Sequence, residues 1–238
     1  MSTPAGKRRI CVAYDIVGYS GRDLHGQFDA QSRLAVILGA GCAAAGLGEN
    51  DYAIQQQGDG GLALLPTGGD VDDPRLFASF LQTIDAELVE VNRFRAPETR
   101  LRLRVALHEG VVFEADHGYV GAAVVEVFRM CDAAPTREAL GANPDANMVI
   151  VVADRLYTDI FRYSLHGIPG EAFVRHDLRL KSFSGQGWIF VPGGNAAPAA
   201  KGRQAEADGA RAQASKPSPK PEPIDLQTIL GSDDFSDL

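Results

Sequence analysis

The stretch Val12-Ala13-Tyr14-Asp15-Ile16-Val17-Gly18-Tyr19-Ser20 is an apolar run interrupted by a single carboxylate, Asp15. Residues 9–15 predict a buried strand, and a charge that closes such a strand costs free energy unless another group pairs with it. A second aspartate, Asp59, lies in Gln57-Gly58-Asp59-Gly60-Gly61, whose glycines favour a tight hairpin. Because Asp before Gly is also a common turn residue, this second pattern alone leaves a purely structural role open.

The elements between the two aspartates predict that their side chains meet. Residues 24–46 have the apolar spacing of a helix, and residues 53–57 and 62–65 predict a hairpin around Asp59. A strand, a helix and a returning hairpin place the two carboxylates at neighbouring strand ends. Paired carboxylates form a hard-oxygen site for Mg²⁺ or Mn²⁺, the ions that handle triphosphates.

The rest of the chain continues the alternation of strands and helices. A helix with a clear apolar stripe begins at Pro74. Residues 100–107 alternate as a strand with one buried face, and His108-Glu109-Gly110 predicts a turn into residues 111–113. A helix at 121–133, a strand at 147–152, a helix at 153–163 and a hairpin at 173–190 follow. The order predicts an α+β fold of the ferredoxin-like type, enlarged by extra elements.

The composition predicts one cytoplasmic domain, residues 8–192, followed by an appendage. The 238 residues are 45% hydrophobic, residues 1–9 are too polar for a secretory signal, and no apolar run approaches the ~20 residues that cross a bilayer. A net charge of −8 disfavours binding to nucleic acid or to an anionic membrane. The three cysteines have no ligand-like spacing, so we expect buried reduced thiols.

The composition changes after Pro192. Residues 193–222 contain no aromatic residue and are rich in Ala, Gly, Pro and Lys, which predicts a flexible linker. Residues 223–238 combine Ile224, Ile229 and Leu230 with an acidic end. This segment is either a short helix that docks on a protein partner or on the chain's own body, or a tail without a specific role.

Together the motifs resemble the signature blocks of class III nucleotidyl cyclases, in the right order and at suitable spacing. The blocks are residues 14–20, Gln57-Gly58-Asp59, residues 105–112, and Gly121 through Arg129-Met130. The resemblance implies a nucleotidyl cyclase catalytic domain, which converts a nucleoside triphosphate to a 3′,5′-cyclic nucleotide and pyrophosphate on two metal ions in a head-to-tail homodimer. The compact chain also resembles the small stand-alone pyrimidine cyclases of bacterial phage defence.

The resemblance assigns roles to individual residues. It makes Asp15 and Asp59 the carboxylates that bind two Mg²⁺ or Mn²⁺ ions, with the backbone carbonyl of Ile16 as a further ligand. The backbone N–H groups of Val17, Gly18, Tyr19 and Ser20 are expected to face the β- and γ-phosphates at the start of the following helix. The Ser20 side chain is equally well explained as a helix N-cap.

Two cationic side chains match the family's phosphate-binding positions. Arg129, eight residues after Gly121, matches the arginine that stabilises the transition state from the partner subunit. The structural alternative is a surface arginine with a solvated head. Lys181 falls where the family keeps a triphosphate-contacting lysine, although Ser182 replaces the glycine that follows it there.

Three departures from the family pattern bear on catalysis and on the base. Val125 stands where the family has a ribose-orienting asparagine, and either the adjacent Glu126 substitutes for it or the site lacks one support. Gln55 and Gly118 occupy the base-selecting positions, and a Gln side chain does not fix one base. Two further functions remain open: a cyclase-like binding or scaffold protein, and a polymerase-like palm that links nucleotides.

Overall fold

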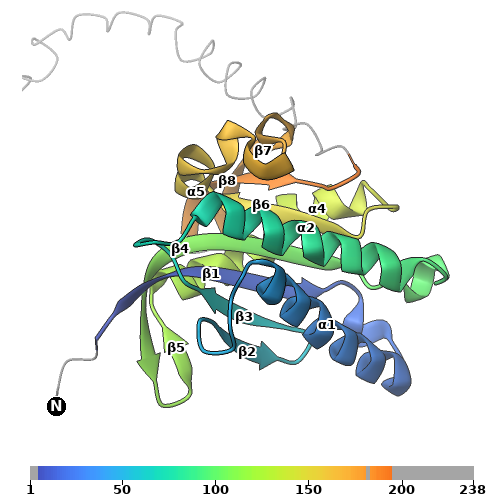
Figure 1. Ribbon diagram of the computed structural model, residues 1–238. Helices are drawn as coiled ribbons and strands as arrows, with labels where there is room; N and C mark the ends of the chain where they lie inside the picture. Colours follow the sequence, from blue (N-terminus) through green and yellow to red (C-terminus); the bar gives the residue numbers. More distant parts are fainter. Residues whose placement is uncertain (1–4, 181–182, 195–238) are drawn as a thin grey trace, which may run out of the picture. The chain divides into compact units, whose positions relative to one another are not determined.

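The computed structural model describes residues 5–180 and 183–194. Its first half is a ferredoxin-like unit of four strands and two helices (Figure 1). These elements are β1 (Lys7–Ile16), α1 (Leu24–Ala44), β2 (Ala53–Gln57), β3 (Gly60–Leu65), α2 (Asp73–Asn92) and β4 (Leu103–Ala115). β1 lies between β3 and β4 and is antiparallel to both, and β2 pairs with the outer edge of β3. The predicted α+β architecture is therefore confirmed.

The second half of the described chain extends this sheet beyond β4. Its elements are β5 (Gly118–Val120), α3 (Ala122–Cys131), α4 (Ala134–Gly141), β6 (Met148–Ala153), α5 (Asp154–Asp159), β7 (Val174–Leu180) and β8 (Phe183–Phe190). The strand order is β2-β3-β1-β4-β6-β8-β7, with β5 paired to the far end of β4. β4 and β6 run parallel, as expected for strands joined by helices.

The sheet has two buried faces, each with its own apolar core. α1 and α2 cover one face of the sheet (Figure 1). Alternate residues of β1, namely Ile10, Val12 and Tyr14, belong to the same apolar core as the buried residues of these helices. α3 and α4 pack on the other face, against Cys11 and Ala13 of the same strand. The expectation that residues 100–107 have a single buried face is therefore wrong. Side chains that point away from α1 and α2 point towards α3.

The structure corrects the expected turn at residues 108–110. β4 continues through this segment as one strand, and Gly110 lies within it. A Cβ at Gly110 would stand 2.5 Å from Cβ of Ala123 on α3, so the glycine permits the close approach of the helix. β5 and α4 were not predicted, and α5 is shorter than the helix expected at 153–163.

Two expectations from the composition can be compared with the described residues. Cys11, Cys42 and Cys131 are buried free thiols, as expected. Within residues 5–180 and 183–194, no helix is long and apolar enough to cross a membrane. The linker and docking segment expected at residues 193–238 lie outside the described residues from residue 195 onward, and so does Lys181.

Candidate functional site

The two aspartates singled out by the sequence line the same pocket. Asp15 is the penultimate residue of β1 and pairs in register with Gly60 of β3, directly after Asp59. The N–H of Ile16 donates to the carbonyl of Asp59 at 2.9 Å, which ties the strand end to the hairpin. Gly60 is required at this point because a Cβ there would lie 2.3 Å from the Tyr14 carbonyl oxygen. The pocket, of about 220 Å³, is lined by Tyr14, Asp15, Gln57, Asp59, Gly60, Gly61, Arg104, Phe128, Cys131 and Asp132.

A guanidinium that sequence reasoning missed binds the first aspartate. Arg104 lies opposite Asp15 in the β1–β4 register. Its Nε donates to Asp15 Oδ2 at 2.9 Å, and its Nη2 donates to the same oxygen. Both side chains are largely buried, with 16% of Arg104 and 24% of Asp15 exposed. Asp15 therefore has the partner that its burial requires.

The protonation of Asp15 reflects opposing influences. Burial is the largest and raises the pKa of its carboxyl group, because the charged form loses hydration. The hydrogen bonds and positive charge of Arg104 lower the pKa, whereas the negative charges of Asp59 and Asp132 raise it. The net direction is upward from the usual value. The ion pair therefore offsets only part of the cost of burying this carboxylate.

Asp132 extends the ion pair into a line of alternating charges. Arg104 Nη1 approaches Asp132 Oδ1 at 3.5 Å, and Arg137 Nη1 lies 3.1 Å from the same oxygen. Asp132 directly follows α3 and is 63% exposed. One arginine thus lies between a largely buried carboxylate at the strand end and an exposed carboxylate at the end of a helix.

The donor atoms in this pocket suit a hard divalent cation. Asp15 and Asp59 contribute carboxylate oxygens, and no described residue donates a hydrogen bond to the Asp59 side chain. Arg104 donates to Oδ2 of Asp15. If a metal ion binds Asp15, this carboxylate therefore interacts with both the metal and Arg104. Among the described residues, no group of three or more His, Cys, Asp or Glu side chains is arranged to hold a metal ion.

The segment expected to contact phosphates is a turn that precedes α1. Gly18 has a positive φ of 70°, and Tyr19–Gly21 form a single 3₁₀ turn. The N–H of Val17 already donates to the Arg102 carbonyl at 2.9 Å. The helix begins later, at Leu24, where Asp23 is the N-cap and accepts a hydrogen bond from Gly26 N–H at 2.8 Å. The N-cap explanation of Ser20 is therefore wrong.

α3 carries the other residues that the resemblance singled out. Val125 is 48% exposed, and Glu126 Oε2 lies 2.9 Å from His108 Nε2 on β4. His108 Nδ1 is 2.8 Å from the Glu109 carbonyl, so both nitrogens of its ring have partners. Among the described residues Arg129 has no hydrogen bond or ion pair. The pocket around Asp15 is not lined by Arg129, although Phe128 and Cys131 of the same helix line it.

The two base-selecting positions are in contact. A Cβ at Gly118 on β5 would lie 2.4 Å from Gln55 Oε1 on β2. Gln55 Nε2 also approaches the carbonyl of His117 at 3.5 Å. The resemblance assigned both residues to base selection, and the structure brings them together although they lie far apart in the sequence.

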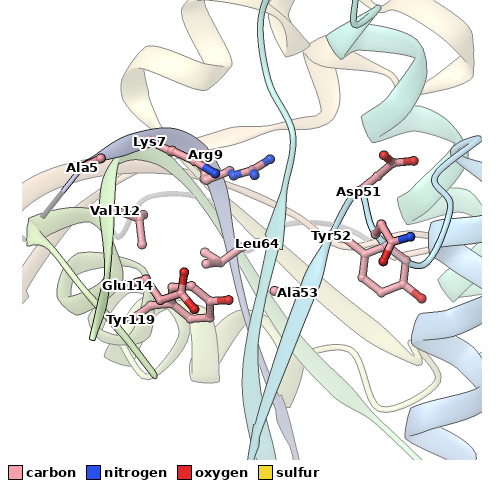
Figure 2. Close-up of a pocket in the computed structure, with 11 residues that line it drawn as sticks. Ala5, Lys7, Arg9, Asp51, Tyr52, Ala53, Leu64, Val112, Glu114 and Tyr119 are labelled. Atoms are coloured by element: carbon pink, nitrogen blue, oxygen red, sulfur yellow. The ribbon is translucent and has the colours of Figure 1, made fainter. Parts of the chain in front are cut away.

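A second pocket, of about 210 Å³, lies beyond Gln55 on the side of the N-terminal end of β1. Figure 2 shows Lys7 and Arg9 along one wall, Glu114 and Tyr119 together on the β4–β5 pair, and Asp51 and Tyr52 on the opposite side. The lining mixes both signs of charge. None of the residues predicted to bind metal or substrate lines it.

Comparisons with known proteins agree on the fold. No protein-family model matches the sequence, and no curated protein matches it. The solved structure of the guanylyl cyclase Cya2 aligns with a TM-score of 0.52 and 16% identity, over 80% of this chain and 93% of that chain. An adenylate/guanylate cyclase/hydrolase from Silicibacter pomeroyi aligns with a TM-score of 0.52 and 20% identity, over 80% and 99%.

A bacterial light-regulated adenylyl cyclase also aligns with a TM-score of 0.52, at 15% identity, over 79% of this chain and 53% of that chain. At these identities the likeness concerns the fold. The described chain has the fold of class III adenylyl and guanylyl cyclase catalytic domains.

Proposed function

We propose that this protein is a nucleotidyl cyclase that forms a 3′,5′-cyclic nucleotide second messenger and pyrophosphate from a nucleoside triphosphate. The observation that carries the proposal is the shared pocket of Asp15 and Asp59 at neighbouring strand ends of a cyclase-like fold. Neither carboxylate is needed there to hold the hairpin, because backbone pairing between Ile16 and Asp59 already does so.

The residues of the pocket divide the work of the reaction. Asp15 and Asp59, with the carbonyl of Ile16, would hold Mg²⁺ or Mn²⁺. Such ions lower the pKa of an attacking hydroxyl and neutralise phosphate charge. Gly18, Tyr19 and Ser20 lie directly after this strand end and would face the phosphate chain. Lys181 is assigned to the triphosphate by the resemblance alone.

The site requires a second copy of the chain. Arg129 has no described partner and stands outside the Asp15 pocket of its own chain, so its guanidinium is available to another subunit. Three exposed valines surround the start of α3, which suits an apolar contact between copies; they are Val111, Val120 and Val125. In a head-to-tail homodimer, Arg129 would spread the charge that develops on the α-phosphate.

The decisive experiment is product analysis with each of the four nucleoside triphosphates and Mn²⁺. We expect a cyclic mononucleotide and pyrophosphate from at least one, with Gln55 contributing to the choice of base. Asp15→Ala and Asp59→Ala should each abolish the product. Arg155→Ala, which removes an exposed ion pair with Asp159, serves as the control and should retain the activity. Absence of a cyclic product from all four nucleotides would reject the proposal.

A non-catalytic alternative is favoured by two observations. Val125 offers no hydrogen bond to a ribose, and Arg104 already neutralises Asp15 without a metal. On this alternative the chain binds nucleotide as a scaffold, and residues 223–238 recruit a partner. Calorimetry separates the two functions, because a scaffold would bind a triphosphate and return it unchanged in the product analysis.

A further inference from the structure

We propose that Arg104 is an internal counter-ion that competes with divalent metal for Asp15, and that metal binding moves its guanidinium onto Asp132. The inference rests on the proposed metal site and adds a residue that sets its affinity. It starts from the geometry of the sheet. Asp15 and Arg104 are direct neighbours across β1 and β4, so the pairing is built into the strand register.

The contacts of Arg104 show which atoms are contested. Its Nε and Nη2 both engage Oδ2 of Asp15, and no described residue donates to Oδ1. Oδ1 therefore remains open to a cation. A dication bound to this carboxylate would stand close to the guanidinium, and two like charges in a largely buried pocket repel each other strongly. A bound metal ion and the Arg104 guanidinium therefore each weaken the other's interaction with Asp15.

Asp132 provides a second carboxylate partner for Arg104. Its Oδ1 already lies 3.5 Å from Arg104 Nη1, so the guanidinium can shift its contacts without leaving the pocket. Asp132 is also held by Arg137, which keeps its carboxylate in position. The backbone of Arg104 stays fixed during the exchange, because it is paired on both sides by β1 and β6. Only the side chain needs to move.

The exchange has a thermodynamic consequence for the protein without metal. Asp15 needs a cation in both states, and Arg104 supplies it when metal is absent. Removing Arg104 should therefore destabilise the metal-free protein and increase the affinity for metal. A ligand that binds only the folded state raises its melting temperature more when it binds more tightly. Stability and affinity thus change in opposite directions.

The test measures binding of Mn²⁺ alone, without nucleotide, by the loss of the free-ion signal in electron paramagnetic resonance, together with thermal unfolding. We expect Arg104→Met to bind Mn²⁺ more tightly by about tenfold or more. It should also melt below the wild type without Mn²⁺ and show a larger rise in Tm with it. If this variant does not fold, Arg104→Lys is the substitute, and a single ammonium should also allow tighter Mn²⁺ binding than wild type.

A matched control exists on the same two strands. Arg8 on β1 forms a cross-strand ion pair with Glu109 on β4 at 3.0 Å, away from the pocket. Arg8→Met removes one arginine–carboxylate pair between β1 and β4 and should leave Mn²⁺ affinity at the wild-type value. A tighter affinity in Arg8→Met would mean that net charge explains the result, and would overturn the inference.

The proposed movement of the Arg104 guanidinium onto Asp132 is tested by combining variants. Asp132→Asn should weaken Mn²⁺ binding in the wild-type background, since Arg104 then has no alternative partner. It should have little effect when Arg104 is already Met. Equal weakening in both backgrounds would show that Asp132 acts on the metal directly, and would overturn this step.

Failure of this inference is distinguishable from failure of the proposed function. Mn²⁺ binding that depends on Asp15, shown by its loss in Asp15→Asn, but is unchanged or weakened in Arg104→Met, rejects the role of Arg104 alone. The metal site would then stand, with Arg104 orienting Asp15 for it. If neither wild type nor any variant binds Mn²⁺, both the metal site and the role of Arg104 are rejected.

Discussion

Gln55 on β2 packs directly against Gly118 on β5, so that a Cβ added to Gly118 would meet Oε1 of Gln55 at 2.4 Å. Gly118 also has a φ of 128°, which disfavours any side chain. The two positions at which the resemblance expects base selection are therefore sterically coupled. A residue with a side chain at 118 requires a different rotamer, or a different residue, at 55.

The first expected outcome concerns this contact. Gly118→Ala should lower the free energy of unfolding by about 1–3 kcal/mol, because it combines backbone strain with the clash against Gln55. Gln55→Ala removes the clash but not the strain, so the cost of Gly118→Ala should be smaller in that background. Chemical denaturation of the four variants measures the coupling. Additive effects would contradict the contact.

The second outcome concerns Arg129 and the proposed homodimer. Arg129→Ala should reduce turnover by about 10²–10³-fold, while Mn²⁺ binding at the Asp15 pocket persists. Asp15→Ala should be inactive alone, and Arg129→Ala should keep only its small residual activity. An equimolar mixture should recover about a quarter of the wild-type activity, since half of the dimers then carry one intact composite site.

Mixing is also the sharpest check on subunit contribution. If the mixture stays inactive after the subunits have exchanged, Arg129 and Asp15 act within one chain and the composite site is wrong. Tagged and untagged wild-type subunits, mixed and followed by native mass spectrometry, provide the reference for the rate of exchange.

The third outcome concerns the pH dependence of stability and a residue that does not line the Asp15 pocket, Asp85. Asp85 on α2 is half-buried and has no described partner, and burial raises the pKa of its carboxyl group. The folded state therefore holds this proton to a higher pH than the unfolded state. The favourable contribution is present below the unfolded pKa and is lost as pH rises through the folded pKa. Asp85→Asn should raise Tm at pH 7, and the gain should disappear towards pH 3.

Thermal unfolding at a series of pH values provides the measurement. Glu87→Gln removes the same charge from the same helix and serves as the control for net charge. A gain in Tm from Asp85→Asn that is equal at pH 7 and pH 3 would contradict the burial argument.

Local patterns in the sequence were sufficient to predict the ferredoxin-like unit. The apolar stripe of α2 and the glycine hairpin around Asp59 are local signals, and both elements form where they were expected. Gly110 misled the prediction, since a glycine signals a turn and a close helix contact equally well. α4 has no apolar stripe in its eight residues and contains Pro135, so hydrophobic periodicity did not predict this helix.

The charged partners in the pocket were harder to predict for a related reason. Arg102 and Arg104 alternate with apolar residues and were taken for the exposed face of a strand. Instead they face α3 and α4, where Arg102 donates to the carbonyls of Ala146, Leu140 and Asn143. The pairing of Arg104 with Asp15 spans 89 residues and depends on strand register, which no local pattern specifies.

The absence of a side chain at Gly110 sets the position of α3. α3 rests on this residue through Ala123, and the same helix holds Glu126 and Arg129 in place. A single added methyl group would act as a wedge, tilting the helix as a rigid rod and displacing the guanidinium six residues further along. If the protein acts as proposed, chemistry at its subunit boundary would then be altered by a change that touches neither nucleotide, metal nor neighbouring chain.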